Sequence, residues 1–421
     1  MVSLSLNSKK LQQDLGVELS EAILDKIVMM GAEIDENTPE QLVVDITPNR
    51  PDLLSQPGFT RALAAFLGIR PGLQPYVVTP SKLKVHVDES VRNIRPYTAA
   101  AVIKGITIDE EKLRELIEIQ EKLHVTFCRK RKRAAIGIYP MDAIQGNITF
   151  LALPPEKIKF RPLESETEMT AKEILEQHPK GKEYAHLLQG LPMYPLFVDS
   201  KKRVLSLPPI INSHEVGKVT TTTTEMFLEA SGHDQRVCQQ VVQIICAALA
   251  DMGASIQTVE VVYGRKSDIT PNMQPAIQQF YGYYVDRRLG VTIKREDLPI
   301  LLAKMGVGFS ETRIKDTYQA VIPPYRVDFL HQIDVVEDIA IAYGYENIVS
   351  ELPQLGTLGG ETKRTKLERM IRAILCGTKL LETSTYHLLG KEYQRHIDPS
   401  DDIVTLKSSV SEEYDSLRAS L

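Results

Sequence analysis

Four acidic residues close together in the sequence have the spacing of a cation site. Asp334, Glu337 and Asp338 stand three and four residues apart, so in a helix they fall within about 100° of one another on one face. Asp328 lies just ahead of that helix and could fold back toward them. Carboxylate oxygens that converge on one point suit a hard cation such as Mg2+. We call these four residues the acid cluster.

A structural role would explain the same acids. Negative charge in the first turn of a helix is favoured by the helix dipole, and Asp334 could simply cap the helix. The apolar residues of the segment lie on the opposite face: Val336, Ile339, Ala340 and Tyr343. We therefore expect that face to pack on the core and the three helical acids to point away from it. The chemistry of the residues leaves both interpretations open.

The segment that carries the acids occurs twice in the chain. Residues 46–69 read ITPNRPDLLSQPGFTRALAAFLGI, and residues 322–345 read IPPYRVDFLHQIDVVEDIAIAYGY. The two agree at eight positions, whereas unrelated segments of this length should agree at roughly one or two. The sequence therefore contains an internal repeat. We call residues 46–69 the first copy and residues 322–345 the second copy.

The two copies differ where chemistry could lie. The acids of the second copy stand where the first has other residues: Gly58 matches Asp334, Arg61 matches Glu337 and Ala62 matches Asp338. Arg50 and Asp52 of the first copy match Arg326 and Asp328 of the second. The repeat thus separates a shared scaffold from a site expected only in the second copy.

The composition is that of a soluble globular chain with several domains. With 421 residues, 43% hydrophobic and 25% charged, the chain is too long for one core and too apolar for disorder. Its net charge of −5 gives no sign of a nucleic-acid partner, so any such partner must meet a local patch. The start, MVSLSLNSKKL, lacks the apolar core of a signal peptide, and no uncharged run could span a bilayer. The four cysteines have no CxxC spacing. We expect a cytoplasmic protein.

The order of elements predicts an α+β multidomain chain. Two related helix–strand–turn–helix units, at 1–80 and 275–350, flank a mixed α/β domain at 84–270, and a further part covers 355–421. In the first unit a helix is predicted over Ser20–Met30 and a strand over Val43–Ile46. Further elements are predicted in the other parts: helices over Glu110–Leu123, from about Val237 to Gly253 and over Thr365–Leu375, and strands over Ala134–Ile138 and Ile148–Leu153.

One strongly basic run, Arg129-Lys-Arg-Lys-Arg133, could neutralise phosphates of a nucleic acid. The alternative is a solvated face, which is the commoner role of such runs. No GxxxxGK[ST], GxGxxG or HExxH pattern is present, so the sequence predicts neither a nucleotide loop nor catalytic zinc in this chain.

The second copy resembles a known family. PPYRVDFLHQIDVVEDIAIAYGYENI is similar to the metal-binding segment of the beta subunit of phenylalanyl-tRNA synthetases of the archaeal and eukaryotic type. Other stretches resemble the same family in its order: PNRPDLLSQPGFTRALAAFLGI its amino-terminal segment, RKRKRAAIGIYPMD, HPKGKEYAHLL and YPLFVDSKKRVLSLPPIINS its central domain, and SSVSEEYDSLRASL its class II synthetase-like domain. The last stretch lies inside that domain in the family, so we expect the chain to stop before the domain is complete.

This resemblance implies an (αβ)2 heterotetramer that attaches phenylalanine to tRNA(Phe) with ATP and Mg2+. The alpha subunit would bind ATP and phenylalanine and carry the aminoacylation site, so no catalytic residue for that step is expected in this chain. The beta subunit would add tRNA contacts and hydrolysis of mischarged Tyr-tRNA(Phe). The family's magnesium positions fall on the acid cluster: Asp328, Asp334, Glu337 and Asp338.

The resemblance also places an editing pocket in the central, editing-type domain. The segments expected to line it are 208–213 and 229–234, with these polar candidates: Asn212, Ser213, Glu229 and Asp234. Rejecting tyrosine needs groups that pair with its phenol hydroxyl. The same residue types also cap loops. His233 departs from the family pattern, in which a small residue is common.

Two rival functions remain open at this point. One is a non-catalytic tRNA- or RNA-binding scaffold derived from a synthetase beta subunit. The other is a free-standing editing hydrolase that acts on Tyr-tRNA.

Overall fold

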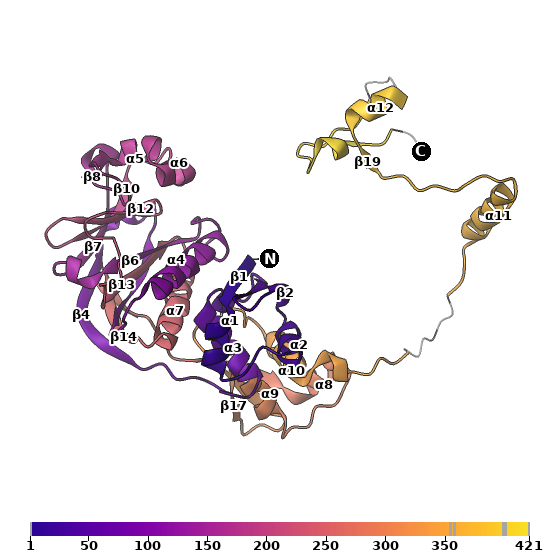
Figure 1. The fold of residues 1–421 in the computed structure, drawn as a ribbon, viewed down its shortest axis with the longest axis horizontal. Helices are drawn as coiled ribbons and strands as arrows, with labels where there is room; N and C mark the ends of the chain where they lie inside the picture. The colour runs from indigo at the N-terminus through magenta and orange to yellow at the C-terminus, as the bar shows by residue number, and fades with distance from the viewer. Residues whose placement is uncertain (1, 353–355, 357–358, 398–401, 420–421) are drawn as a thin grey trace. The chain divides into compact units, whose positions relative to one another are not determined.

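The structure is a computed structural model that describes residues 2–352, 356, 359–397 and 402–419. It divides into two compact units, Met1–Val349 and Ser350–Leu421, which are described separately (Figure 1). Within the described residues no helix is long and apolar enough to cross a membrane.

The first copy belongs to a small sheet covered by helices. Its strands β1, β2 and β3 form an antiparallel sheet in the order β1-β3-β2. Leu42, Val44 and Ile46 alternate on the buried face of β3, as a half-buried strand requires. The elements are β1 Val2–Asn7, α1 Ser8–Leu15, α2 Glu21–Met29, β2 Glu33–Asn37, β3 Gln41–Ile46, the 3-10 turn η1 Pro51–Leu53 and α3 Gln56–Phe66. The predicted helix over 20–30 and strand over 43–46 are confirmed as α2 and β3.

The second copy belongs to a unit with the same topology. Its three-stranded sheet has the order β16-β18-β17, which matches β1-β3-β2 strand for strand. The elements are β16 Ala276–Tyr281, α8 Gly282–Leu289, α9 Leu298–Lys304, β17 Gly308–Glu311, β18 Thr317–Ile322, α10 Gln332–Tyr343 and η6 Tyr345–Asn347. Each copy is thus the end of a longer β-α-α-β-β-α unit, whose leading strand and helix the sequence comparison did not reveal.

The unit that contains the first copy packs against the unit that contains the second copy. The backbone N–H of Gly72, just after the first copy, donates to the carbonyl of Ala303 in α9 at 2.7 Å. The Arg61 guanidinium of α3 lies 3.8 Å over the ring of Tyr325 in the turn before α10. Figure 1 shows the indigo elements around the first copy beside the orange elements around the second copy.

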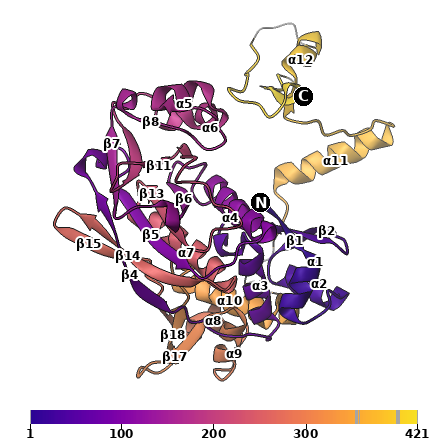
Figure 2. The same cartoon turned by 60° about the vertical axis from the view of Figure 1, so that its left-hand side comes forward.

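A ten-stranded sheet forms the central part, in the order β12-β11-β10-β7-β4-β14-β5-β13-β6 with β15 paired to β14 (Figure 2). Alternate residues of β5 and β13 point to opposite faces of the sheet. Both faces are buried, and α7 covers one of them. The elements are β4 Val78–Val87, β5 Tyr97–Lys104, α4 Glu110–Val125, β6 Ala134–Pro140, β7 Ile148–Leu153, β10 Tyr194–Asp199, β11 Val204–Leu207, β12 Ile211–Asn212, β13 Met226–Gly232, α7 Gln235–Asp251, β14 Ser255–Tyr263 and β15 Lys266–Thr270. The predicted helices and strands of this region are confirmed.

A satellite core lies beside this sheet. It is built on four short elements: β8 Lys159–Phe160, β9 Met169–Thr170, α5 Ala171–Gln177 and α6 Pro179–Tyr184. The unit Ser350–Leu421 holds α11 Lys363–Gly377, β19 Leu388–Leu389, α12 Lys391–Ile397 and β20 Ser416–Leu417. The predicted helix over 365–375 is confirmed as α11.

Candidate functional site

The two terminal strands of the ten-stranded sheet approach each other. Asn212 of β12 donates its side-chain amide to the carbonyl of Ile138 in β6 at 3.3 Å. The hydroxyl of Tyr139 in β6 donates to Ser206 Oγ in β11 at 2.7 Å. A cavity of about 540 Å3 lies along this seam, and we call it the seam cavity.

One wall of the seam cavity is apolar and comes from α4 and β6. Leu113, Leu116 and Ile117 contribute from the helix, and Ile136 and Ile138 from the strand. The lining also contains polar groups from other elements: Ser206, Asn212, His214, Lys218 and Glu229. A cavity of this size with apolar walls and a few convergent polar groups is typical of a small-ligand site.

The exposed edge of β6 is occupied by side chains. The Ile136 N–H donates to His124 Nε2 at 2.8 Å, and Gln120 Nε2 donates to the Ile136 carbonyl at 3.0 Å. Burial lowers the pKa of His124 to about 4, in keeping with a neutral ring that accepts a backbone hydrogen bond. These contacts fix α4 over the strand edge and so shape the cavity wall.

Glu229 is the buried acid of the seam cavity. Its Oε1 lies 3.0 Å from the Tyr139 hydroxyl, and its Oε2 has no hydrogen-bond partner among the described residues. Burial raises the pKa of Glu229 to about 8, against the opposing effects of Tyr139 and Arg95. The carboxyl is therefore neutral at pH 7. Gly137 faces Glu229 across the strands, where an added Cβ would collide with both Tyr139 and Glu229.

Arg131 holds another wall of the cavity. Its Nη1 donates to the carbonyls of Pro209 and Ile210 at 3.1 and 2.9 Å, and its Nη2 lies 2.9 Å from Glu121. The guanidinium also lies 4.3 Å over the ring of Tyr184. The sequence analysis expected the basic run to face either solvent or a nucleic acid, but the Arg131 side chain points inward.

The basic run divides because its backbone forms a left-handed turn. Residues 129–131 have φ values of 50°, 51° and 63°, a conformation that costs side-chain-bearing residues energy and persists where the surroundings impose it. Arg129, Lys130 and Lys132 are exposed. Arg133 is half-buried and lies 3.8 Å from Asp234. Three of the five basic groups thus face solvent.

Two of the predicted editing residues line the cavity and two do not. Asn212 and Glu229 are in the wall. Ser213 is buried outside the lining, where its Oγ accepts the Val216 N–H at 3.3 Å. Asp234 caps α7 through the N–H groups of residues 236 and 237. His233 is exposed and also outside the lining.

The acid cluster does not gather into one site. Asp328 takes a two-point ion pair from Arg326, Nε–Oδ1 at 2.9 Å and Nη2–Oδ2 at 2.7 Å. Asp338 Oδ1 lies 2.9 Å from the same Nη2. Asp334 Oδ2 accepts the N–H groups of residues 330 and 331, each at 2.7 Å, and so caps α10.

The fourth acid also has its own partner, since Glu337 Oε2 accepts the Tyr345 hydroxyl at 3.0 Å. Asp338 is only 4% exposed, so the expectation that all three helical acids point away from the core is wrong for this residue. Among the described residues no three His, Cys, Asp or Glu side chains stand close enough to hold a metal ion. The arrangement therefore does not fit Mg2+ as it stands, and the four ligands stay a prediction.

Arg326 dominates the electrostatics of this region. Its side chain is 1% exposed. Burial opposes its charge, but Asp338 and Asp328 outweigh that effect and raise the pKa of Arg326. Burial would likewise raise the pKa of Asp328, yet Arg326 lowers it. Arg326 and Asp328 thus hold each other charged, whereas burial raises the pKa of Asp338 against the opposing effect of Arg326.

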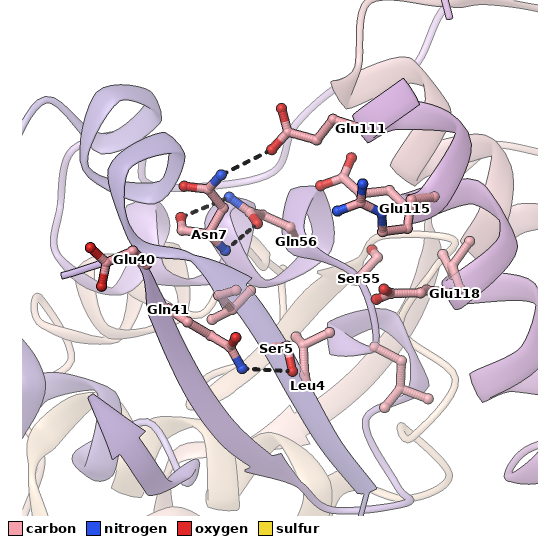
Figure 3. A pocket seen from close by; sticks show the side chains of 14 residues that line it. Leu4, Ser5, Asn7, Glu40, Gln41, Ser55, Gln56, Glu111, Glu115 and Glu118 are labelled. Carbon is pink, nitrogen blue, oxygen red and sulfur yellow. Dashed lines mark hydrogen bonds between the residues drawn. The ribbon is translucent and has the colours of Figure 1, made fainter. Parts of the chain in front are cut away.

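A smaller cavity of about 300 Å3 lies between β1 and α4. Figure 3 shows Glu111, Glu115 and Glu118 of α4 facing Asn7 and Gln56 across it. Asn7 donates its amide to Glu111 at 3.2 Å, and Lys10 lies 3.4 Å from Glu115. These contacts join β1 and α1 to α4 of the central part. We therefore interpret this cavity as a gap in the packing between these elements.

Comparison with known proteins gives a consistent result. The family described as tRNA synthetase B5 domain matches residues 280–345, and that described as phenylalanyl tRNA synthetase beta chain CLM domain matches 348–421. A phenylalanine–tRNA ligase beta subunit from Archaeoglobus fulgidus is 37% identical over 406 residues, which are 95% of this chain and 73% of that protein. The chain belongs to the phenylalanine–tRNA ligase beta-subunit family. The predicted resemblance is confirmed.

Other members of the beta-subunit family agree. The Thermococcus sibiricus subunit is 40% identical over 374 residues, 88% of this chain and 66% of the relative. The chain thus spans about two thirds to three quarters of such subunits. A crystal structure of an N-terminal fragment of the Pyrococcus horikoshii phenylalanyl-tRNA synthetase beta subunit matches with a TM-score of 0.77 and 35% identity, over 81% of this chain and 99% of the fragment. The mixed α/β multidomain architecture is therefore that of the family.

Proposed function

We propose that this chain acts as the beta subunit of a phenylalanine–tRNA ligase, assembled with an alpha subunit as an (αβ)2 heterotetramer in the cytoplasm. The alpha subunit would bind ATP, Mg2+ and phenylalanine and charge tRNA(Phe). Support comes from identity to named beta subunits along nearly the whole chain. The Mg2+ site that the sequence predicts on the acid cluster is not part of this proposal.

The seam cavity is the proposed editing site for Tyr-tRNA(Phe). The observation that carries this is Glu229, a buried acid whose Oε2 lacks a partner, beside an apolar wall. A tyrosyl ring would pack on the α4 wall and bring its hydroxyl to Glu229. A phenylalanyl ring would leave the carboxyl unpaired, and that loss discriminates strongly between the two.

Glu229 serves this purpose as a neutral acid. A protonated carboxyl can both donate to and accept from a phenol hydroxyl. Because its pKa is about 8, the carboxyl changes from a group that donates and accepts to one that only accepts as the pH rises through that value, so editing should change with pH in this range. Asn212 and His214 line the same cavity and would orient the ester and the attacking water.

The tRNA would approach over exposed cations. Lys218 lies in the cavity lining, and Arg129, Lys130 and Lys132 flank the inward-pointing Arg131. Phosphate neutralisation by lysine and arginine supplies most of the non-specific affinity for nucleic acid.

Co-expression with an alpha subunit tests the proposal. Phenylalanine charging by the complex, together with deacylation of Tyr-tRNA(Phe) that Glu229→Ala removes, would support it. Deacylation by the isolated chain, without assembly, would favour the free-standing hydrolase. Binding of tRNA with neither activity would favour the scaffold.

A further inference from the structure

The acid cluster already contains a cation. The Arg326 guanidinium joins Asp328 through two hydrogen bonds and Asp338 through a third, and its Nη1 donates to the Met305 carbonyl at 3.3 Å. The same group lies 4.6 Å over the ring of Phe329. Contacts with two acids, a backbone carbonyl and an aromatic ring fix its position.

The first copy shows that this arrangement does not depend on a metal. Arg50 forks onto Asp52 with Nε–Oδ1 at 2.9 Å and Nη2–Oδ2 at 2.8 Å, the same pairing as between Arg326 and Asp328. Yet Ala62 stands in the first copy where Asp338 stands in the second. The arginine–aspartate fork is therefore common to both copies, and the second adds one buried acid to it.

The ion pairs of Arg326 occupy three of the four carboxylate oxygens of Asp328 and Asp338, and the fourth, the buried Oδ2 of Asp338, has no hydrogen-bond partner among the described residues. Mg2+ requires oxygen ligands at about 2.0–2.1 Å in octahedral geometry, with several waters. Asp328 uses both oxygens on Arg326, and Asp338 uses one. A second cation on the same acids would be repelled by a guanidinium that stays charged at any physiological pH.

We infer that the Arg326 guanidinium is the resident cation of the acid cluster, and that Asp328 and Asp338 anchor this arginine instead of holding Mg2+. The role of the cluster is to fix the turn between β18 and α10, against which Arg61 of the first copy packs through Tyr325. This inference is independent of the editing proposal.

Titration of the 421-residue chain with Mg2+ tests the inference directly. Thermal unfolding, followed from EDTA to millimolar Mg2+ at constant ionic strength, should show no saturable change, and calorimetry should detect no binding to these acids. The same titration on the complex with the alpha subunit should agree. Saturable Mg2+ binding that Asp328→Asn or Asp338→Asn abolishes would overturn the inference, and this arm needs no arginine variant to fold.

A matched pair of variants sharpens the test. Arg326→Met should lower the melting temperature by roughly 5–10 °C because two buried acids lose their cation. Mg2+ should restore part of that loss, since the freed carboxylates then face each other. Arg203→Met should also melt lower, but Mg2+ should not restore it because Arg203 pairs with a single acid, Asp199. Equal responses of the two variants to Mg2+, or an unchanged melting temperature in Arg326→Met, would contradict the inference.

Discussion

At the scale of single residues, Glu229 links pH to stability. An unfolded glutamate titrates near pH 4.3, whereas burial raises the pKa of Glu229 to about 8 in the folded chain. Between these values the folded state binds the extra proton, so stability falls as the pH rises from the lower value to the higher. A neutral amide at this position has no such proton to lose.

Glu229→Gln should therefore flatten this part of the pH profile. We expect the variant to gain on the order of 3–5 kcal/mol relative to the parent as the pH rises from about 4.5 to 8. Thermal melts at a series of pH values check this. Glu225→Gln, which removes a partly exposed acid paired with Lys104 at 3.0 Å, is the control and should leave the profile unchanged. A parallel shift of both variants would contradict the assignment.

Residue types alone did not separate the four editing candidates. Asn212 and Glu229 line the cavity, while Ser213 and Asp234 satisfy backbone N–H groups. Ser213 and Asp234 lie just after the ends of β12 and β13, and where these strands end depends on pairing with strands distant in sequence. The capping role of Asp234 could have been predicted, because an aspartate directly before an apolar helical stripe is a typical helix start.

At the scale of elements, that cap gives a second prediction. Asp234→Ala should destabilise α7 by about 1 kcal/mol, the usual value of an N-cap, and should leave Tyr-tRNA(Phe) deacylation unchanged. Asp234→Asn keeps a capping oxygen and should retain most of the stability. A melting curve and a deacylation assay on the same preparations check both statements. Loss of deacylation in either variant would show that Asp234 takes part in the editing site.

Arg131 gives a third prediction, about the wall formed by residues 208–210. Lysine keeps the charge but cannot donate to Pro209, Ile210 and Glu121 together. We expect Arg131→Lys to slow deacylation of Tyr-tRNA(Phe) roughly tenfold, which corresponds to about 1.4 kcal/mol, and to leave phenylalanine charging unchanged. Arg129→Lys, on the exposed side of the same turn, should change neither. Equal effects of the two substitutions would mean that the turn acts only through charge.

The inward position of Arg131 was beyond prediction from the sequence. Five consecutive basic residues look equivalent in a linear chain, and a solvated or tRNA-facing run was expected. The three left-handed residues turn one side chain inward, and no glycine or asparagine marks that conformation in the sequence.

At the scale of the whole molecule, the repeat was partly predictable. The matched segments revealed the turn and last helix of each copy because Arg50, Asp52 and their counterparts hold the same buried ion pair. The leading elements, β1 and α1 against β16 and α8, escaped notice because a strand and a surface helix tolerate many residues on their exposed faces. The placement of Asp338 also escaped it, since its burial results from packing around Arg326.

The exposed cations give a fourth prediction, on tRNA binding. Lys130→Gln with Lys132→Gln should weaken tRNA binding at low salt and reduce the slope of log affinity against log salt by about 1–2. The matched control is Lys201→Gln with Lys202→Gln, an exposed pair outside the cavity lining. Binding titrations at several salt concentrations check the slopes. Identical slopes for the two double variants would show that only the overall charge matters.

The side chains that cover the edge of β6 have a consequence beyond the cavity they shape. An edge strand with free N–H and carbonyl groups is a template on which another chain can add a strand and begin to aggregate. Here His124 and Gln120 occupy the N–H and the carbonyl of Ile136, and Asn212 occupies the carbonyl of Ile138. The residues that line the seam cavity therefore also leave fewer free backbone groups for strand addition at this edge, so we expect substitutions at these three positions to affect solubility as well as activity.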